Sequence, residues 1–169
     1  VRKAVPDVLF VIAGAGPALP SLEHEVREMD LSENVKFIGY LDRHTELNSC
    51  YRCADLFIFA SRTETQGLVL LEAMAQGVAV VSTAELGTRD VLREGAGVWI
   101  AREELADFSN KVVRLLDDAK VRASLGEAGR EYAHGWSASQ QAGRMVAFYH
   151  AVHAVRSASA VPELSALPL

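Results

Sequence analysis

The sequence has few cysteines, few aromatic residues and no hydrophobic run long enough to cross a membrane. Two cysteines and 7% aromatic residues stand in a chain of 169 residues. A membrane-spanning helix needs about 20 consecutive apolar residues, and no apolar run approaches that length. No basic amphipathic stretch indicates a helix on a membrane surface either. The sequence therefore shows no membrane anchor, and membrane association of a longer protein stays open.

Positive charge is also scarce. Lys and Arg together number 17 against 22 Asp and Glu, which gives a net charge of -5. Nucleic-acid-binding domains carry a basic patch or stripe, so we expect no nucleic-acid partner. The chain begins at Val1 in what reads as the end of a helix, with no visible secretion signal. We therefore expect it to be part of a longer protein, whose targeting its own start does not reveal.

The two cysteines, Cys50 and Cys53, are spaced as Cys-x-x-Cys. This spacing occurs in redox pairs and in halves of zinc sites. A thioredoxin-type pair would open a helix after a strand, whereas this pair lies inside a helical pattern and no second pair follows. We therefore expect ordinary helix residues in a reducing, cytoplasmic compartment.

Short apolar runs alternate with amphipathic segments along the chain. Strands that are apolar on both faces and alternate with helices are typical of a parallel sheet covered on two sides. We therefore predict an α/β fold, a Rossmann-like doubly wound parallel sheet of five or six strands with helices on both faces and C-terminal helices. The expected strands are 8–13, 35–38, 56–60, 79–81 and 98–100, and the expected helices are 19–29, 45–53, 68–76, 88–93, 103–117, 120–133 and 137–156. The expected folded domain is 1–156, with a flexible tail over 157–169.

Two glutamates, Glu64 and Glu72, flank Gly67 in the most hydrophobic part of the sequence. A helix that begins after Gly67 presents free amides, which attract phosphate. Glu72 lies about one turn further, roughly 6–7 Å along the axis, and helical side chains lean back toward the amino end. A carboxylate there could bind the ribose diol of a nucleotide, and Glu64 could bind a second diol. This arrangement predicts a nucleoside diphosphate sugar as ligand; a capping acid and a buried, ion-paired acid are the alternative interpretation of the same spacing.

The stretch Ser61-x-x-Glu64-x-x-Gly67-x-x-x-x-Glu72-Ala73-Met74-Ala75-x-Gly77-x-Ala79-Val80-Val81 resembles the Glu-x7-Glu signature of retaining nucleotide-sugar glycosyltransferases with the GT-B fold. Other stretches are similar to further motifs of that family, and the resemblance covers roughly residues 8–149. They are 10–17 (I-V-G-x-G-P), 35–41 (V-x-F-x-G), 54–58 (A-D) and 135–137 with Phe148 and Tyr149.

The resemblance implies the donor-binding domain of such an enzyme over 1–156 and assigns roles to its residues. It implies that Glu64 is the catalytic residue that contacts the donor sugar and that Glu72 contacts the ribose. The diphosphate would meet the amides after Gly67, and the base would lie in the loop after Gly39. The donor-contacting residues that it implies, besides the two glutamates, are Gln66, Gly67, Leu68, Val69, Tyr40, Leu41, Gly14 and Gly16.

The sequence departs from the family pattern at three positions. Gln66 replaces the usual Phe, Ala79 the usual Pro and Asp90 the usual Glu. Gln66 leaves the donor sugar open. The family's phosphate-binding Arg and Lys, and its acceptor-binding N-terminal domain, would lie upstream of this chain.

We expect neither a metal nor a cofactor. The chain contains no Asp-x-Asp, the usual ligand set for a divalent ion on a sugar diphosphate. Negative charge on the leaving group would then be stabilised by the helix terminus and by basic side chains, for which Arg62 and Arg89 are candidates. We expect His150 and His153 to be surface residues, because no third ligand is in view.

Three functions follow from these patterns. The first is the donor-binding half of a retaining glycosyltransferase that acts on an unknown acceptor, with the isolated chain inactive. The alternative is a catalytically silent module that binds a nucleotide or sugar phosphate, which Gln66 and Asp90 favour. A dinucleotide oxidoreductase would use Gly14-x-Gly16, but the third glycine and the ribose-binding acid about 20 residues on are missing.

Overall fold

The computed structural model describes residues 1–43 and 45–158. The chain divides into two compact units, Val1–Ala133 and His134–Leu169. The tail expected over 157–169 lies outside the described residues from 159 onward, while residues 157 and 158 belong to the last helix. No helix in the described ranges is long and apolar enough to cross a membrane.

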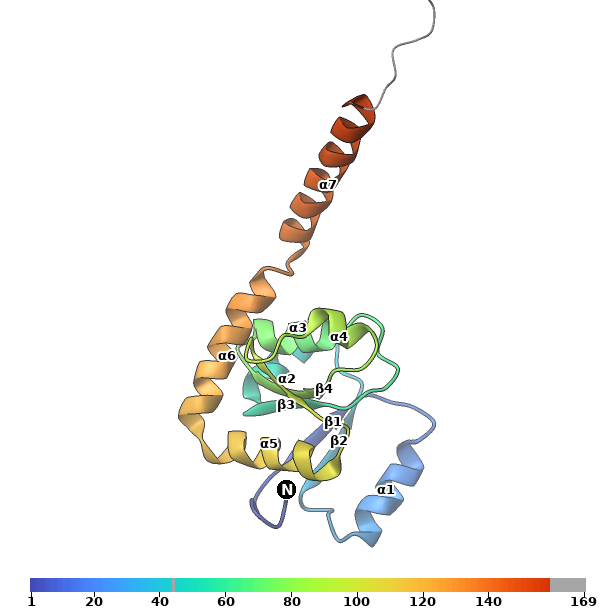
Figure 1. Ribbon diagram of the computed structural model, residues 1–169. Helices are drawn as coiled ribbons and strands as arrows, with labels where there is room; N and C mark the ends of the chain where they lie inside the picture. The colour runs from blue at the N-terminus through green and yellow to red at the C-terminus, as the bar shows by residue number, and fades with distance from the viewer. Residues whose placement is uncertain (44, 159–169) are drawn as a thin grey trace, which may run out of the picture. The chain divides into compact units, whose positions relative to one another are not determined.

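Strands alternate with helices along the first unit, which confirms the α/β prediction (Figure 1). Every strand pairing is parallel. The strands are β1 (Phe10–Ala13), β2 (Val35–Gly39), β3 (Leu56–Phe59), β4 (Ala79–Thr83) and β5 (Val98–Ala101). The helices are α1 (Leu19–Glu28), α2 (Leu47–Cys53), α3 (Leu68–Ala75), α4 (Gly87–Val91), α5 (Leu105–Asp117), α6 (Ala119–His134) and α7 (Ala138–Ala158).

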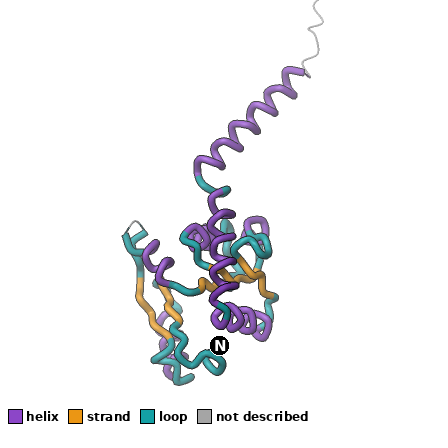
Figure 2. The backbone as a smooth tube through the Cα atoms, turned by 90° about the vertical axis from the view of Figure 1, so that its left-hand side faces the viewer, coloured by secondary structure: helices purple, strands orange, loops and turns teal. Residues whose placement is uncertain are grey.

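The described strands form two sheets, whereas the sequence pattern predicts one sheet of about five or six strands. The two-stranded sheet has the order β1-β2 and the three-stranded sheet the order β3-β4-β5 (Figure 2). Phe10 and Val11 in β1 are 41% and 40% exposed, and α1 has no buried residue. The apolar pattern of 8–13 predicts a buried strand, but a strand is buried only where other elements cover both of its faces.

The three-stranded sheet lies between helices. All five residues of the central strand β4 are buried. Figure 1 shows α3 and α4 on one face of this sheet and α5 on the other. Alternate residues of a strand point to opposite faces, and on the α5 face they form one cluster with residues of α5 and α6. Its buried members are Ala79, Val81, Ala101, Val112, Leu115 and Leu125.

On the other face, α3 contributes Leu70 and Met74, which are both fully buried. The α6 helix packs closely on the loops before β4 and β5, because Gly126 and Gly129 allow backbone contact. A Cβ atom on Gly129 would lie 2.9 Å from the Cα atom of Gly97, and one on Gly126 would overlap the carbonyl of Gly77. The buried side chains of α3 therefore fix this helix in the core of the first unit.

Candidate functional site

Glu64 lies in the loop that connects the carboxyl end of β3 to α3. Its Oε1 atom accepts hydrogen bonds from the backbone amides of Gln66, at 2.9 Å, and Gly67, at 2.8 Å. These two hydrogen bonds, opposed in part by desolvation, lower the pKa of the Glu64 carboxyl group. The carboxylate therefore shapes its own loop and stays ionised at neutral pH.

Gly67 is the residue from which α3 begins. Its φ angle of 68° lies in the left-handed region, which glycine adopts without a steric penalty. Leu70 and Leu71 donate to its carbonyl oxygen at 3.1 and 3.3 Å. The amides of Leu68 and Val69 have no acceptor within residues 1–43 and 45–158. These two amides are free to donate hydrogen bonds, and the positive end of a helix is where an anion binds favourably.

Glu72 extends from the second turn of α3 and is held by two side chains. Its Oε1 atom pairs with the guanidinium of Arg43, and its Oε2 atom accepts from the Tyr51 hydroxyl at 3.4 Å. Tyr51 is buried, and this burial, together with the negative charge of Glu72, raises its pKa. The Tyr51 ring packs edge-on against Phe57 of β3, with centroids 5.5 Å apart. Both oxygens of Glu72 are thus engaged, and the side chain is 22% exposed.

The residues expected near the base and the glycine turn lie at the carboxyl ends of β1 and β2. The Gly14 amide donates to the Gly39 carbonyl at 2.7 Å, so the two loops meet. Tyr40 follows directly and is 86% exposed, while Leu41 is half-buried. Arg43 lies in the same loop as Tyr40 and Leu41, and its ion pair with Glu72 connects this loop to α3.

Sequence reasoning missed Arg43 and Tyr51 as neighbours of Glu72. The signal that could have found them is the placement of a carboxylate inside a nearly apolar helix, which requires a charged or hydrogen-bonding partner. Tyr51 lies between the two cysteines on α2, and α2 contacts α3. Cys50 and Cys53 are both free and lie on α2, as the helical pattern predicted.

Arg62 and Arg89, the two arginines that the sequence suggests as cations for the leaving group, lie in different surroundings. Arg62, whose side chain is 77% exposed, pairs with Glu103 beyond β5. Arg89 is exposed on α4. Within residues 1–43 and 45–158, neither arginine forms a hydrogen bond or an ion pair with Glu64 or Glu72.

The loop before α4 packs directly against the Glu64 loop. A Cβ atom on Gly87 would overlap the carbonyl of Thr65, so only glycine allows this approach. The preceding Leu86 has φ 48° and ψ -126°, a conformation that L-residues rarely adopt, and its side chain is largely exposed. Such strain costs on the order of 1–3 kcal/mol and is common at functional sites.

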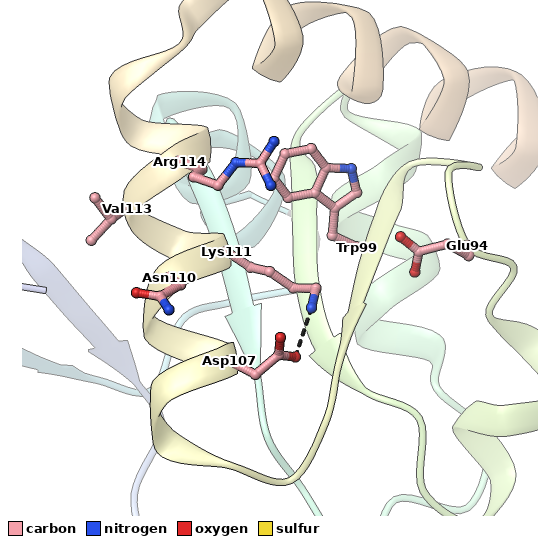
Figure 3. Close-up of a pocket in the computed structure, with 7 residues that line it drawn as sticks. All are labelled: Glu94, Trp99, Asp107, Asn110, Lys111, Val113 and Arg114. Atoms are coloured by element: carbon pink, nitrogen blue, oxygen red, sulfur yellow. Dashed lines mark hydrogen bonds and ion pairs between the residues drawn. The ribbon is translucent and has the colours of Figure 1, made fainter.

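An open pocket of about 560 Å³ lies between β5 and α5 (Figure 3). The Arg114 guanidinium lies 5.1 Å from the centre of the Trp99 ring, and Lys111 donates to Asp107 at 2.6 Å. This pocket is on the α5 face of the three-stranded sheet, whereas Glu72 extends from α3 on the opposite face. It is therefore separate from the glutamate site.

The two carboxylates that line this pocket cap the outer edge of β5. Glu94 accepts from the backbone amide of Ile100 at 2.6 Å, and Asp107 accepts from that of Arg102 at 2.8 Å. Unpaired edge amides invite other strands to pair with them. Glu94 and Asp107 therefore occupy these two backbone amides, with which another strand could otherwise pair.

The sequence matches the family model described as Glycosyl transferases group 1 over residues 1–132. It is 33% identical to a GDP-mannose-dependent monoacylated alpha-(1-6)-phosphatidylinositol monomannoside mannosyltransferase of Corynebacterium glutamicum, with 81% of this chain and 37% of the relative covered. It is 34% identical to D-inositol 3-phosphate glycosyltransferase 2 of Catenulispora acidiphila, with 83% and 34% covered. The chain thus spans about a third of the length of these relatives.

Solved structures of glycosyltransferases with the GT-B fold are similar to this one. Sucrose-phosphate synthase from Thermosynechococcus elongatus matches with a TM-score of 0.74 and 25% identity, covering 86% of this chain and 38% of that one. The C-terminal domain of a glycosyl transferase group 1 family protein from Francisella tularensis matches with a TM-score of 0.69 and 27% identity, covering 79% and 71%. The chain therefore belongs to the glycosyl transferases group 1 family.

Proposed function

We propose that this chain is the donor-binding half of a retaining glycosyltransferase that uses a nucleoside diphosphate sugar. The observation that carries the proposal is the amino end of α3, where the amides of Leu68 and Val69 are available between two carboxylates. The name of one relative includes dependence on GDP-mannose, which is a donor of this chemical class.

In the proposed complex, the diphosphate accepts hydrogen bonds from the amides of Leu68 and Val69 at the positive end of the helix. Glu72, one turn further along α3, accepts hydrogen bonds from the ribose diol. Glu64, on the other side of these amides, accepts from hydroxyl groups of the donor sugar. The order of ribose, diphosphate and sugar in the ligand matches the order of Glu72, the amides and Glu64 in the chain.

The remaining donor contacts come from the loops after β1 and β2. We propose that Tyr40 and Leu41 lie along the base and that Gly14 and Gly16 leave room for the donor. Gln66 follows Glu64 in its loop and would contact the sugar, so it is the residue we expect to distinguish one donor sugar from another.

The lowered pKa of Glu64 bears on its role. Because its carboxyl group is ionised at neutral pH, it serves as a hydrogen-bond acceptor and not as a proton donor. We assign no protein nucleophile. We propose that transfer takes place on the face of the sugar that the diphosphate leaves, with the departing diphosphate accepting the acceptor's proton and the α3 terminus stabilising its charge.

The whole protein's acceptor and partners are proposals too. Because this chain spans about a third of its relatives, we propose that an acceptor-binding domain precedes it and completes the cleft. The chain alone would then bind donor without transferring its sugar, because the acceptor is not positioned. We propose that the enzyme needs neither a metal nor a cofactor and works in the cytoplasm.

The test is turnover of nucleotide sugars by the full-length protein. UDP-, GDP- and ADP-linked hexoses are supplied, and the release of nucleoside diphosphate is measured for the wild type, Glu64→Gln and Glu72→Gln. We expect one class of donor to be consumed and each variant to lose roughly a hundredfold or more in rate. NMR of the product's anomeric proton should show retention.

Two outcomes would oppose the proposal. If no nucleotide sugar is consumed although nucleotides bind normally, the catalytically silent binding module is the better description. The departures from the family pattern at Gln66 and Asp90 favour that second candidate. If an inverted product forms, the proposed stereochemistry is wrong.

A further inference from the structure

Arg43 pairs with the same carboxylate that the proposed function assigns to the ribose. We propose that Arg43 exchanges partners on donor binding: it pairs with Glu72 in the empty protein and with the donor's diphosphate in the complex. Arg43 would then be a specificity-determining residue for the diphosphate, supplied by the loop that also carries Tyr40 and Leu41. This inference rests on the proposed function.

The first argument is the occupancy of Glu72. Its Oε1 atom pairs with Arg43 and its Oε2 atom accepts from Tyr51 at 3.4 Å. A ribose diol that bonds to both oxygens must displace or share with one of these partners. Tyr51 is only 6% exposed and is packed against Phe57, whereas the Arg43 side chain is 66% exposed. Arg43 is therefore the partner that can leave.

The second argument is charge. The diphosphate brings negative charge to a site that already holds the carboxylates of Glu64 and Glu72, and such charges need a cation nearby. Arg62 is paired with Glu103 and not with either glutamate among the described contacts. Arg43 is the arginine that the described contacts place against a site carboxylate. Its planar guanidinium can donate two parallel hydrogen bonds to phosphate oxygens in a bidentate arrangement.

The third argument is reach. Glu72 lies four residues after Leu68 on α3, which corresponds to roughly 6 Å along the helix axis. The guanidinium of Arg43 already contacts the Glu72 carboxylate, whose side chain leans toward the amino end of α3. Rotation about the side-chain bonds of Arg43 can move its guanidinium toward the amides of Leu68 and Val69, where the diphosphate is proposed to bind. No secondary-structure element has to move.

The partner exchange would couple recognition of the ribose to recognition of the phosphates. When the ribose takes Glu72, it releases the cation that the diphosphate needs. A nucleoside without phosphates has to displace Arg43 from Glu72 and has no negative group with which the displaced guanidinium can pair. The protein should therefore discriminate strongly between a nucleoside diphosphate and its nucleoside.

The experiment compares nucleosides with their diphosphates on the full-length protein. Uridine, guanosine and adenosine, and UDP, GDP and ADP, are titrated into the wild type, Arg43→Gln, Arg43→Lys and a matched control, with NMR shifts following weak binding. The control is Arg2→Gln, because Arg2 also pairs with a carboxylate, that of Asp30, at 3.6 Å near the amino end of β1. Glu72→Gln is titrated alongside.

We expect Arg43→Gln to weaken binding of the preferred diphosphate about tenfold, as loss of a charged hydrogen bond does, and to leave nucleoside binding unchanged or tighter. Arg43→Lys should restore part of the diphosphate affinity, and Arg2→Gln should change neither. Glu72→Gln should weaken the binding of both the nucleoside and the diphosphate.

Three results would overturn the partner exchange while leaving the proposed function intact. They are tighter binding of both ligands to Arg43→Gln, equal weakening of both ligands, and no change in either, each in a protein whose wild type binds nucleotide through Glu72. Equal weakening would mean that Arg43 only holds its loop in place. If the wild type binds none of the six ligands, or Glu72→Gln binds like the wild type, the proposed function itself fails.

Discussion

The two sheets of the first unit are built from similar strands but are packed very differently. In the three-stranded sheet, all five residues of β4 are buried, and helices cover both faces. In the two-stranded sheet, three of the four residues of β1 are exposed, and α1 buries none of its residues. Both sheets are parallel, so the difference in burial comes from the elements that cover their faces.

This difference divides the candidate site between a well-packed half and a less packed half. Glu72 and the free amides lie on α3, whose Leu70 and Met74 are fully buried, and Glu64 lies in the loop just before this helix. Tyr40 and Leu41 follow the two-stranded sheet. Groups that must be held accurately are best placed on rigid elements, and regions with few buried contacts open more easily. The contact between Arg43 and Glu72 connects the two halves.

The largest expected effect comes from truncating matched leucines in the two halves. Leu115 of α5 is fully buried, whereas Leu22 of α1 is 41% exposed. Leu115→Ala should lower the free energy of unfolding by about 2–5 kcal/mol, and Leu22→Ala by less than about 1 kcal/mol. Urea unfolding of both variants measures the contrast. Equal losses would mean that the two-stranded sheet is as well packed as the other.

A smaller effect, of opposite sign, is expected at Leu86. Its positive φ is strained for leucine, and glycine removes the strain, although glycine also gains more freedom in the unfolded chain. Leu86→Gly should therefore raise the free energy of unfolding by about 1 kcal/mol. Thermal unfolding beside the wild type measures this gain. A loss of stability would show that the exposed leucine side chain makes stabilising contacts that outweigh the strain.

The smallest expected effect is the pH dependence contributed by Glu64. Hydrogen bonds from the amides of Gln66 and Gly67 lower its folded pKa below the ordinary value of 4.5. Its stabilising contribution is therefore present above pH 4.5 and is lost as the pH falls through the lowered folded pKa. Melting temperatures of the wild type and Glu64→Gln, measured from about pH 3 to pH 7, should converge at the acidic end. A difference in melting temperature that stays constant over this range would show that ionisation of Glu64 does not contribute to stability.

Most of the fold could be predicted because it depends on local patterns. Parallel strands and alternating helices follow from apolar runs and turn residues, and α3 ends before Gly77 as predicted. The placement of Leu68 and Val69 amides beside two glutamates follows from helix geometry. These are properties of residues close together in the chain.

The rest depends on residues that are distant in the chain. Arg43 meets Glu72 from 29 positions away, and no local pattern predicts that contact. The division into two sheets depends on which strands pair with one another, which apolar runs do not specify. Leu86, which has a positive φ, adjoins Gly87, and Gly87 packs on Thr65 in a loop that precedes α3.

The most direct test of the central claim is calorimetric titration of the full-length protein with UDP, GDP and ADP, beside Glu72→Ala. The account predicts that one of these nucleotides binds and that the variant loses that binding, which would also identify the donor base. Binding that is equally strong in Glu72→Ala, or no binding of any of the three to the wild type, would contradict it.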